Sequence, residues 1–100
     1  MGAPVVITSR AWRDLSEIID YIAKDNPAAA EKLSGHLLDS AFALGKAPLV
    51  GCHMKGFPGV RMIVHNRYLI FYQVDPGQRR VLVLRFWHSV RDPGKLRFNV

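Results

Sequence analysis

The stretch "SRAWRDLSEIIDYIAKDNPAAAEKL", residues 9–33, has the pattern of two consecutive helices. In its first half, apolar residues recur at three- and four-residue steps, which predicts an amphipathic helix from Arg10 to Lys24. We expect Ser9 to cap this helix, because its hydroxyl can accept an amide hydrogen of the first turn. The acidic Asp14 and Glu17 follow near the positive end of the helix dipole. The apolar stripe comprises Trp12, Leu15, Ile19 and Ile22, widened by Ala11 and Ile18.

The second half of this stretch predicts a second helix. "KDNP" interrupts the first helix, Asn26 is a favourable N-cap, and Pro27 suits the first helical position because its missing amide hydrogen would have no partner there. We expect the second helix to run to about Leu44 and to stop at Gly45. So short a break predicts an antiparallel helix hairpin with both apolar stripes facing one core. The second stripe comprises Ala30, Leu33, Leu37, Ala41 and Leu44.

Strands are predicted on both sides of the hairpin. Before the hairpin, "APVVIT", residues 3–8, favours a short strand. After the hairpin, residues 45–59 form a connection rich in Gly and Pro. Three strand candidates follow it, at Val60–His65, Tyr68–Val74 and Arg80–Trp87. Links as short as "NR" and "DPGQR" join only antiparallel neighbours, which predicts a meander. The sequence therefore indicates an α+β fold of order β-α-α-β-β-β, in which the helix hairpin packs on an antiparallel β-sheet.

Alternation along the last two strands assigns their side chains to faces. On the middle strand, Tyr68 and Tyr72 are expected on one face and Phe71 on the other. On the last strand, a period of two puts Arg85 on the face of Val81, Val83 and Trp87. A guanidinium there needs a partner, because a lone buried charge is too costly. That partner is either an acid of the first helix or a ligand. Both tryptophans, Trp12 and Trp87, are expected to pack, although Trp87 at a strand end can also form part of a partner surface.

Composition limits the class of protein. With 100 residues, 49% of them hydrophobic and 22% charged, the chain has the size and balance of one globular domain. It has no apolar run long enough for a membrane span and no signal peptide pattern, so we expect a cytoplasmic protein without membrane contact. A single cysteine, Cys52, excludes an internal disulfide and cannot by itself form a structural zinc site. No cofactor or metal is expected.

Charge is distributed unevenly. Residues 1–50 hold five Lys and Arg against six Asp and Glu, a net charge of −1, whereas residues 51–100 hold nine against two, a net charge of +7. A strongly basic half attracts polyanions or an acidic protein by long-range electrostatic steering. We therefore expect a polyanionic or acidic partner to bind the second half of the chain; the alternative is that the charge serves solubility alone.

Four stretches together resemble one protein family. They are residues 9–33 above, "APLVG" at 47–51, "PGVRMIVHNRYLIFYQV" at 58–74 and "VLVLRFWHSVRDP" at 81–93. In this order they are similar to the ParE/RelE superfamily of small bacterial toxins from type II toxin-antitoxin modules. The resemblance implies a RelE/ParE-like fold and a hetero-oligomer with a cognate antitoxin, whose C-terminal segment wraps the toxin. An acidic, amphipathic antitoxin segment would complement the basic half.

The superfamily includes two activities. RelE-like members cleave mRNA in the ribosomal A site without a metal, whereas ParE-like members poison DNA gyrase. Metal-free RNA cleavage needs a base, an acid and cations at the phosphate. By resemblance, Arg61 and Arg85 fall at or near phosphate-stabilising arginines of RelE-like toxins. His88 can transfer protons, with Lys55, His65 or His53 as a second group.

Other features favour the ParE-like side. No carboxylate lies between Asp39 and Asp75, and no tyrosine follows Tyr72, so the glutamate and the C-terminal tyrosine of RelE-like nucleases have no counterparts. "HSVRD", residues 88–92, resembles the ending common in ParE-like members. In a structural interpretation, His88 and Arg91 tie the strand end to the helix hairpin and Asp92 pairs with Arg91.

The sequence therefore predicts a ParE-like toxin that binds and poisons DNA gyrase through surfaces rather than through a catalytic group. One alternative is a ribosome-dependent mRNA endonuclease using Arg61, Arg85, His88 and Lys55. The other is a degenerate toxin-fold protein that binds its partner and poisons nothing. The residues expected to contact a target or partner are Arg61, Arg67, Arg85, Trp87, His88 and Arg91.

Overall fold

The computed structural model describes residues 2–98 and confirms the predicted order of helices and strands. It adds a two-residue strand, β2, within the connection at 45–59, and a short 3₁₀-helix near the C-terminus. The elements are β1 (Val5–Ile7), α1 (Ser9–Ala23), α2 (Pro27–Ala43), β2 (Cys52–His53), β3 (Val60–His65), β4 (Tyr68–Asp75), β5 (Arg80–His88) and η1 (Pro93–Lys95).

The five strands form one mixed sheet in the order β1-β5-β4-β3-β2. The meander of β3, β4 and β5 is antiparallel, as the short links predicted. β1 joins the sheet parallel to β5, with Val5 opposite Val81. Both helices and strands β2, β3 and β4 separate β1 from β5 in the chain, so no short link imposes an antiparallel pairing on them.

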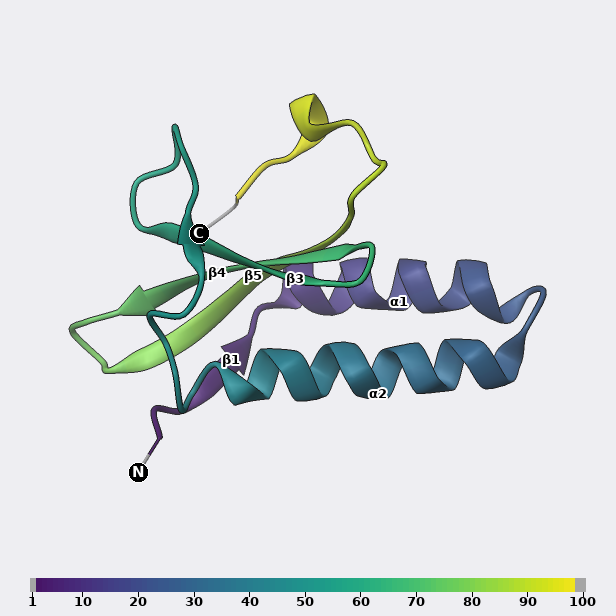
Figure 1. The fold of residues 1–100 in the computed structure, drawn as a ribbon, viewed down its shortest axis with the longest axis horizontal. Coiled ribbons are helices and arrows are strands. Elements are labelled where there is room, and N and C mark those ends of the chain that lie inside the picture. Colours follow the sequence, from purple (N-terminus) through teal and green to yellow (C-terminus); the bar gives the residue numbers. More distant parts are fainter. Residues whose placement is uncertain (1, 99–100) are drawn as a thin grey trace.

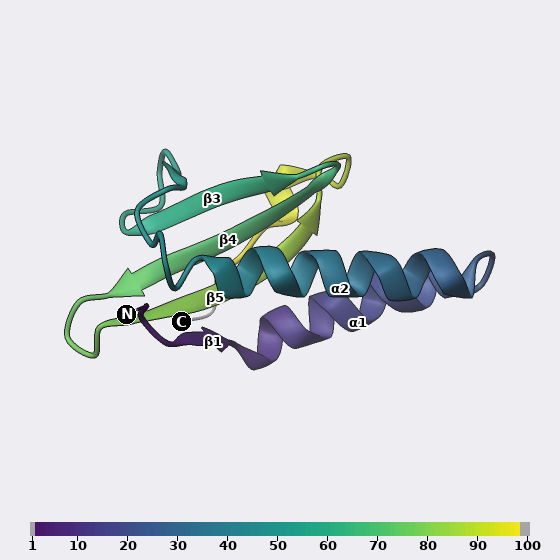
Figure 2. The same ribbon diagram turned by 60° about the horizontal axis from the view of Figure 1, so that its bottom comes forward.

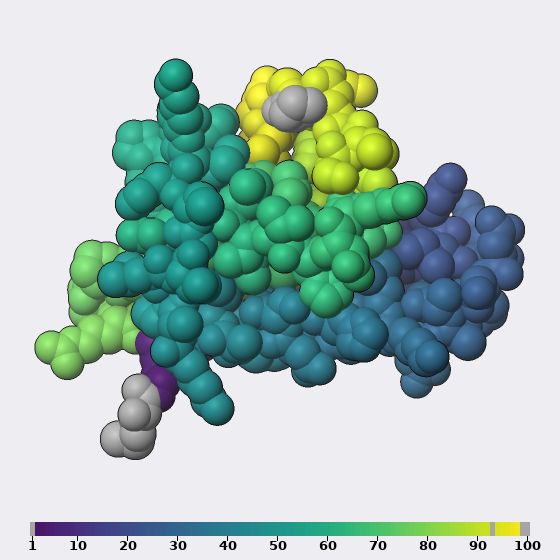
Figure 3. Space-filling model, viewed as in Figure 1, coloured from purple at the N-terminus to yellow at the C-terminus, as the bar shows by residue number. Residues whose placement is uncertain are grey.

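The sheet has a different cover on each face. Figures 1 and 2 show the antiparallel hairpin of α1 and α2 against one face, which we call the helix face. The connection around residues 54–59 and the C-terminal segment cover the opposite face, which we call the outer face; in Figure 3 they form the teal and yellow part of the surface beyond the sheet. Phe98 of the C-terminal segment packs edge-on against Phe57 and Phe71, with ring centres 4.9 and 5.3 Å apart.

Two main apolar clusters follow this division. The helix-face cluster brings Leu15 and Leu37 of the hairpin onto Ile70 and Phe86 of the sheet. The outer-face cluster joins Phe71 and Trp87 to Leu96 of the C-terminal segment. Burying such side chains is worth about 1.5–3 kcal/mol each, so both covers contribute to stability. Among residues 2–98, no helix is long and apolar enough to cross a membrane.

Helix α1 is capped by Thr8, so the prediction that Ser9 caps it was wrong. Thr8 has extended backbone angles, and its Oγ1 accepts a hydrogen bond from the amide of Ala11 at 3.2 Å. The same hydroxyl donates to the carbonyl oxygen of Val83 at 2.9 Å, as does the Thr8 amide at 3.1 Å. Thr8 therefore ends the ladder to β5 and begins the helix, a role that depends on a strand far away in the sequence.

Trp12 does not pack, contrary to expectation: it is 46% exposed, while its neighbour Ala11 is fully buried. The small Ala11 side chain faces the sheet in the helix-face cluster, together with Leu15. Successive residues turn by about 100° around a helix, so with Ala11 facing inward Trp12 lies at the edge of the buried stripe. The rest of the stripe in α2 is arranged as predicted, with Leu37 and Ala41 buried.

A β-bulge in β5 changes the side on which Arg85 lies. Arg85 opposes Phe71 and Val83 opposes Tyr72, so Leu84 is an extra residue without an opposite partner. An extra residue reverses the alternation of side chains. Val83 therefore faces the helices, whereas Arg85 follows Phe71 to the outer face. The predicted common face of Arg85 and Trp87 is confirmed, and its extension to Val81 and Val83 was wrong.

Tyr72 fastens the connection after α2 to the sheet, which yields a stability prediction. Its buried hydroxyl accepts from the Gly51 amide at 2.8 Å and donates to the Pro48 carbonyl at 2.9 Å. Tyr72→Phe leaves both groups without this partner and should lower the free energy of unfolding by about 1–3 kcal/mol in urea denaturation. Tyr21→Phe is the matched control, because Tyr21 is 76% exposed. Equal effects of the two substitutions would contradict this role of Tyr72.

Candidate functional site

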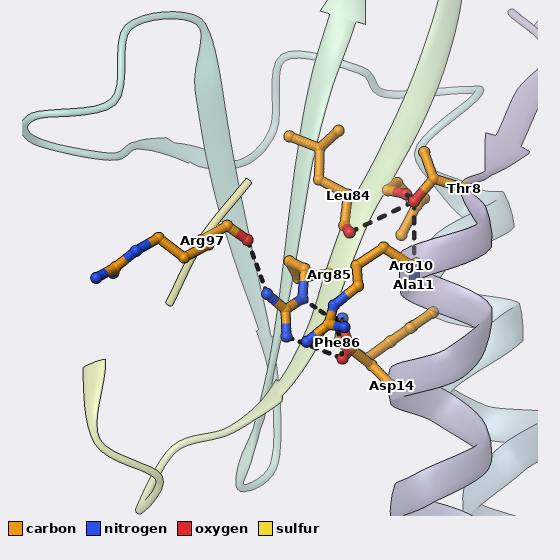
Figure 4. Close-up of polar contacts among 9 residues, drawn as sticks. Thr8, Arg10, Ala11, Asp14, Leu84, Arg85, Phe86 and Arg97 are labelled. Carbon is orange, nitrogen blue, oxygen red and sulfur yellow. Dashed lines mark hydrogen bonds and ion pairs between the residues drawn. The ribbon is translucent and has the colours of Figure 1, made fainter. Parts of the chain in front are cut away.

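Arg85 is held in a buried ion pair with Asp14 of α1 (Figure 4). Both residues are 2% exposed. Arg85 Nε donates to Asp14 Oδ2 at 2.5 Å and Nη2 donates to Oδ1 at 2.9 Å, which is the bidentate geometry of strong guanidinium-carboxylate pairs. A further nitrogen, Nη1, donates to the carbonyl oxygen of Arg97 at 2.7 Å. Of the two partners left open for Arg85, the structure shows an acid of the first helix.

The Asp14 carboxylate also accepts a backbone hydrogen bond from β5 beyond the end of β1. β1 ends at Ile7, so beyond Val83 the edge of β5 has no neighbouring backbone. There the amide of Phe86 donates to Asp14 Oδ2 at 3.3 Å. Arg10 adds a second cation, with its Nε 3.8 Å from Asp14 Oδ1. One carboxylate thus satisfies a backbone donor and a buried guanidinium together.

Sequence reasoning missed this role of Asp14. It assigned Asp14 only to the favourable end of the helix dipole. A signal was present, because Asp14 lies three residues after Ala11 and four before Ile18, inside the apolar stripe of α1. An acid at such a position is buried when the helix packs, and a buried acid needs a cation.

Arg61 and Arg85, the two arginines matched to phosphate-stabilising positions, lie on opposite faces of the sheet. Directly opposed residues in an antiparallel pair share a face. Arg61 opposes Tyr72 on the helix face, and Arg85 opposes Phe71 on the outer face. Arg61 Nη1 donates to the carbonyl oxygens of Gly51 and Leu49 at 2.8 and 3.2 Å. Its guanidinium therefore holds the connection after α2.

The proposed proton-transfer groups are also separated. His88 opposes Tyr68, which packs on the helix-face cluster. Lys55 is exposed in the connection between β2 and β3, next to Met54 of the outer-face cluster. His53 lies on the edge strand β2, and His65 is engaged with Ser40 of α2. The structure does not bring the residues of the nuclease alternative together around one point.

His88 has defined neighbours at the end of β5. Its ring packs edge-on against Tyr68 with centres 4.9 Å apart, and its Nδ1 accepts from the Val90 amide at 3.2 Å. Burial raises the pKa of the Tyr68 phenol, opposed by the smaller effect of the Arg67 charge. The phenol therefore stays protonated near neutral pH and is not poised to act as a base.

Trp87 and Arg91 form a stacked pair. Trp87 is 2% exposed, its Nε1 donates to the Arg91 carbonyl oxygen at 3.2 Å, and the Arg91 guanidinium lies 4.2 Å from the ring centre. Trp87 is thus covered rather than presented to a partner. The predicted pairing of Asp92 with Arg91 was wrong: Asp92 Oδ1 accepts from the Gly94 amide at 2.8 Å, and the ion pairs within residues 2–98 do not include it.

Three of the predicted contact residues gather at one end of the sheet. The amide of Ser89 donates to the Arg67 carbonyl oxygen at 2.8 Å, which brings the β3–β4 turn beside the end of β5. Arg67 and Arg91 are exposed and His88 is half-buried. We call Arg67, His88 and Arg91 the strand-end surface. An open pocket of about 500 Å³ between this end and α1 is lined by His88 and Arg91, by apolar side chains that include Ile18, Ile22 and Phe86, and by the carboxylates Asp14 and Glu17.

The residues described give no indication of a metal centre of the usual kind. Within 2–98, no three His, Cys, Asp or Glu side chains are grouped to hold a metal ion. Cys52 is an exposed free thiol. What this arrangement offers at the strand-end surface is contact with a partner through arginine cations and nearby apolar side chains.

The buried ion pair yields a second stability prediction. Asp14→Ala should cost about 3–5 kcal/mol of unfolding free energy, because it leaves the Arg85 charge buried without its carboxylate. Asp20→Ala on the exposed side of the same helix is the matched control and should change stability by about 0.5 kcal/mol or less. Urea denaturation of both variants measures the difference. A loss of stability no larger at Asp14 than at Asp20 would show that the pair is not needed.

Comparison with solved structures identifies the fold. The toxin-antitoxin complex RelBE2 from Mycobacterium tuberculosis matches with a TM-score of 0.67 and 25% sequence identity, over 88% of this chain and 99% of that chain. The chromosomal ParDE toxin-antitoxin system of P. aeruginosa matches with a TM-score of 0.75 at 20% identity, over 86% and 95% of the two chains. The isolated RelE toxin of E. coli matches with a TM-score of 0.58 at 19% identity, over 92% and 89%.

Comparison at the sequence level is more specific. No curated protein matches the chain. The family model described as the ParE toxin of the type II toxin-antitoxin system parDE matches residues 5–93, which include both helices and all five strands. The chain therefore belongs to the ParE toxin family of type II toxin-antitoxin systems, within the ParE/RelE superfamily that its sequence resembles.

Proposed function

We propose that this toxin arrests growth by binding and poisoning DNA gyrase and has no nuclease activity of its own. The observation that carries the proposal is the engagement of Arg85. Its Nε and both terminal nitrogens donate to Asp14 or to the Arg97 carbonyl oxygen. A guanidinium in this state has little left to offer a phosphate, and Arg61 lies on the opposite face of the sheet.

The strand-end surface is the proposed contact for the target. Arg67 and Arg91 are exposed at one end of the sheet, beside a pocket whose lining is mostly apolar and also contains Asp14 and Glu17. Apolar contact beside exposed cations suits a protein partner with acidic groups, because charge steers the encounter and apolar burial supplies affinity. We assign a structural role to Arg85, Trp87 and Arg61, which under this proposal do not contact the target.

We further propose that a cognate antitoxin neutralises the toxin by covering part of this basic half. The solved RelBE2 and ParDE relatives are toxin-antitoxin systems, which supports an antitoxin partner. An acidic C-terminal segment is the proposed complement, since residues 51–100 carry nine Lys and Arg against two Asp and Glu.

A gyrase cleavage assay and a ribosome-dependent mRNA cleavage assay distinguish the two activities. Purified toxin should stabilise cleavage complexes of gyrase with DNA and leave translated mRNA intact. The matched arm is a ribosome assay in which mRNA is mapped for cuts in A-site codons. The proposal would be overturned in favour of the nuclease by two results together: mRNA cuts that disappear in Arg61→Ala, and no increase in gyrase-DNA cleavage complexes. Inactivity in both assays and harmless expression would favour the degenerate, partner-binding alternative.

Charge reversal tests the surface. Arg67→Glu and Arg91→Glu should each weaken gyrase inhibition by about tenfold or more, because they replace attraction to an acidic partner by repulsion. Arg13→Glu and Arg79→Glu are matched controls, since both arginines are exposed outside the strand-end surface. Concentrations for half-maximal inhibition at two salt concentrations measure the effect. Equal losses at the control positions would show that net charge, and not this surface, sets the activity.

A further inference from the structure

Two histidines and a serine meet where α2 passes the end of β3. Ser40 Oγ lies 3.2 Å from Nδ1 of His65. The ring of His36 lies 5.8 Å from that of His65, measured between centres, and the two planes are tilted by 53°. His36 and Ser40 are four residues apart on α2 and therefore share one face of the helix. None of the three lines the pocket beside the strand-end surface.

His65 carries an unexplained polar atom. Its Nε2 is buried and has no hydrogen-bond partner. Most buried polar atoms in folded proteins are paired, so an exception calls for a reason. The contact with Ser40 suggests one: if Nδ1–H donates to Ser40 Oγ, then Nε2 holds a lone pair. Metal-bound histidines commonly have this arrangement, with the second ring nitrogen donating to a neighbouring group.

We propose that His36 and His65 together bind a divalent transition-metal ion of the zinc type. Imidazole nitrogen suits zinc, copper and nickel. Two imidazoles on one zinc ion, each with a bond of about 2.0–2.1 Å, place their ring centres roughly 5–6 Å apart, and the observed 5.8 Å lies in that range. His36 is exposed, so a small rotation of its ring can bring a nitrogen toward Nε2 of His65. Ser40 is a positioning residue: its hydroxyl can accept from Nδ1–H of His65 and so leave Nε2 free to bind the metal.

The site has two protein ligands, one on the exposed His36 and one on the buried Nε2 of His65. No third His, Cys, Asp or Glu side chain among the described residues joins the pair. Glu31, Lys32 and Asp39 line a shallow pocket on α2 together with His36. Water completes the coordination shell, so affinity is lower than at a closed structural zinc site. The bound ion links α2 to β3 and should stabilise the folded chain, because the unfolded chain does not hold the two rings together.

The test is titration of the full-length chain with ZnCl₂ by calorimetry in a Cys52→Ser background, which removes the exposed thiol as a competing ligand. We expect one zinc ion per chain. Affinity should fall at least tenfold in His36→Ala and in His65→Gln, and about tenfold or more in Ser40→Ala. MgCl₂ should not bind, because magnesium prefers oxygen ligands. His53→Ala is the matched control and should retain binding, since His53 is an exposed histidine elsewhere in the fold.

A second readout separates loss of binding from loss of fold. His36 is exposed, so His36→Ala should leave the thermal midpoint without zinc unchanged. Saturating zinc should raise the midpoint of the Cys52→Ser protein by roughly 5 °C or more and leave that of the His36→Ala protein unmoved. Binding that survives His36→Ala, or that is lost in His53→Ala, would overturn the assignment. So would zinc affinity no better than millimolar in the Cys52→Ser protein.

Discussion

The Asp14 carboxylate resolves a problem that the topology of this chain creates. β5 is longer than its parallel neighbour β1, so part of its edge would be left without hydrogen-bond partners where the helix hairpin crosses it. Asp14 supplies an acceptor for the Phe86 amide and neutralises Arg85. Arg85 in turn holds the C-terminal segment through the Arg97 carbonyl oxygen. Helix, sheet and C-terminal segment therefore meet through one ion pair.

This ion pair is one reason why the arginines of the basic half differ in role. Arg85 and Arg61 are used inside the fold, where their nitrogens satisfy carboxylate and carbonyl oxygens. Arg67 and Arg91 remain exposed near the end of β5. A cluster of arginines in the sequence thus separates into structural arginines and surface arginines. A nuclease needs its cations and proton-transfer groups around one phosphate, whereas binding to a protein needs only a surface. This contrast is the basis of the proposed gyrase activity.

Much of the fold could be predicted from the sequence because its signals are local. The helix periodicity, the Asn26–Pro27 start of α2 and the short strand links each act within a few residues, and the structure confirms them. The features that were missed depend on distant contacts. Thr8 replaces Ser9 as the cap because it also bonds to Val83, and the bulge at Leu84 becomes visible only from the register of β4 and β5. At the candidate site, the choice of Arg67, His88 and Arg91 as contact residues stays a prediction, and the sequence could not tell that Arg61 and Arg85 are bonded inside the fold.

If Arg85 is structural, the toxin should keep its activity when the ion pair is replaced by neutral hydrogen-bonding side chains. In the double variant Asp14→Asn and Arg85→Gln, an amide oxygen can still accept from the Phe86 amide while no charge is buried without a partner. The measurements are growth arrest on expression and formation of gyrase-DNA cleavage complexes. Circular dichroism verifies that the double variant is folded. We expect the double variant to fold and to retain toxicity. A folded double variant without toxicity would contradict this expectation, because Arg85 would then be needed for action on the target.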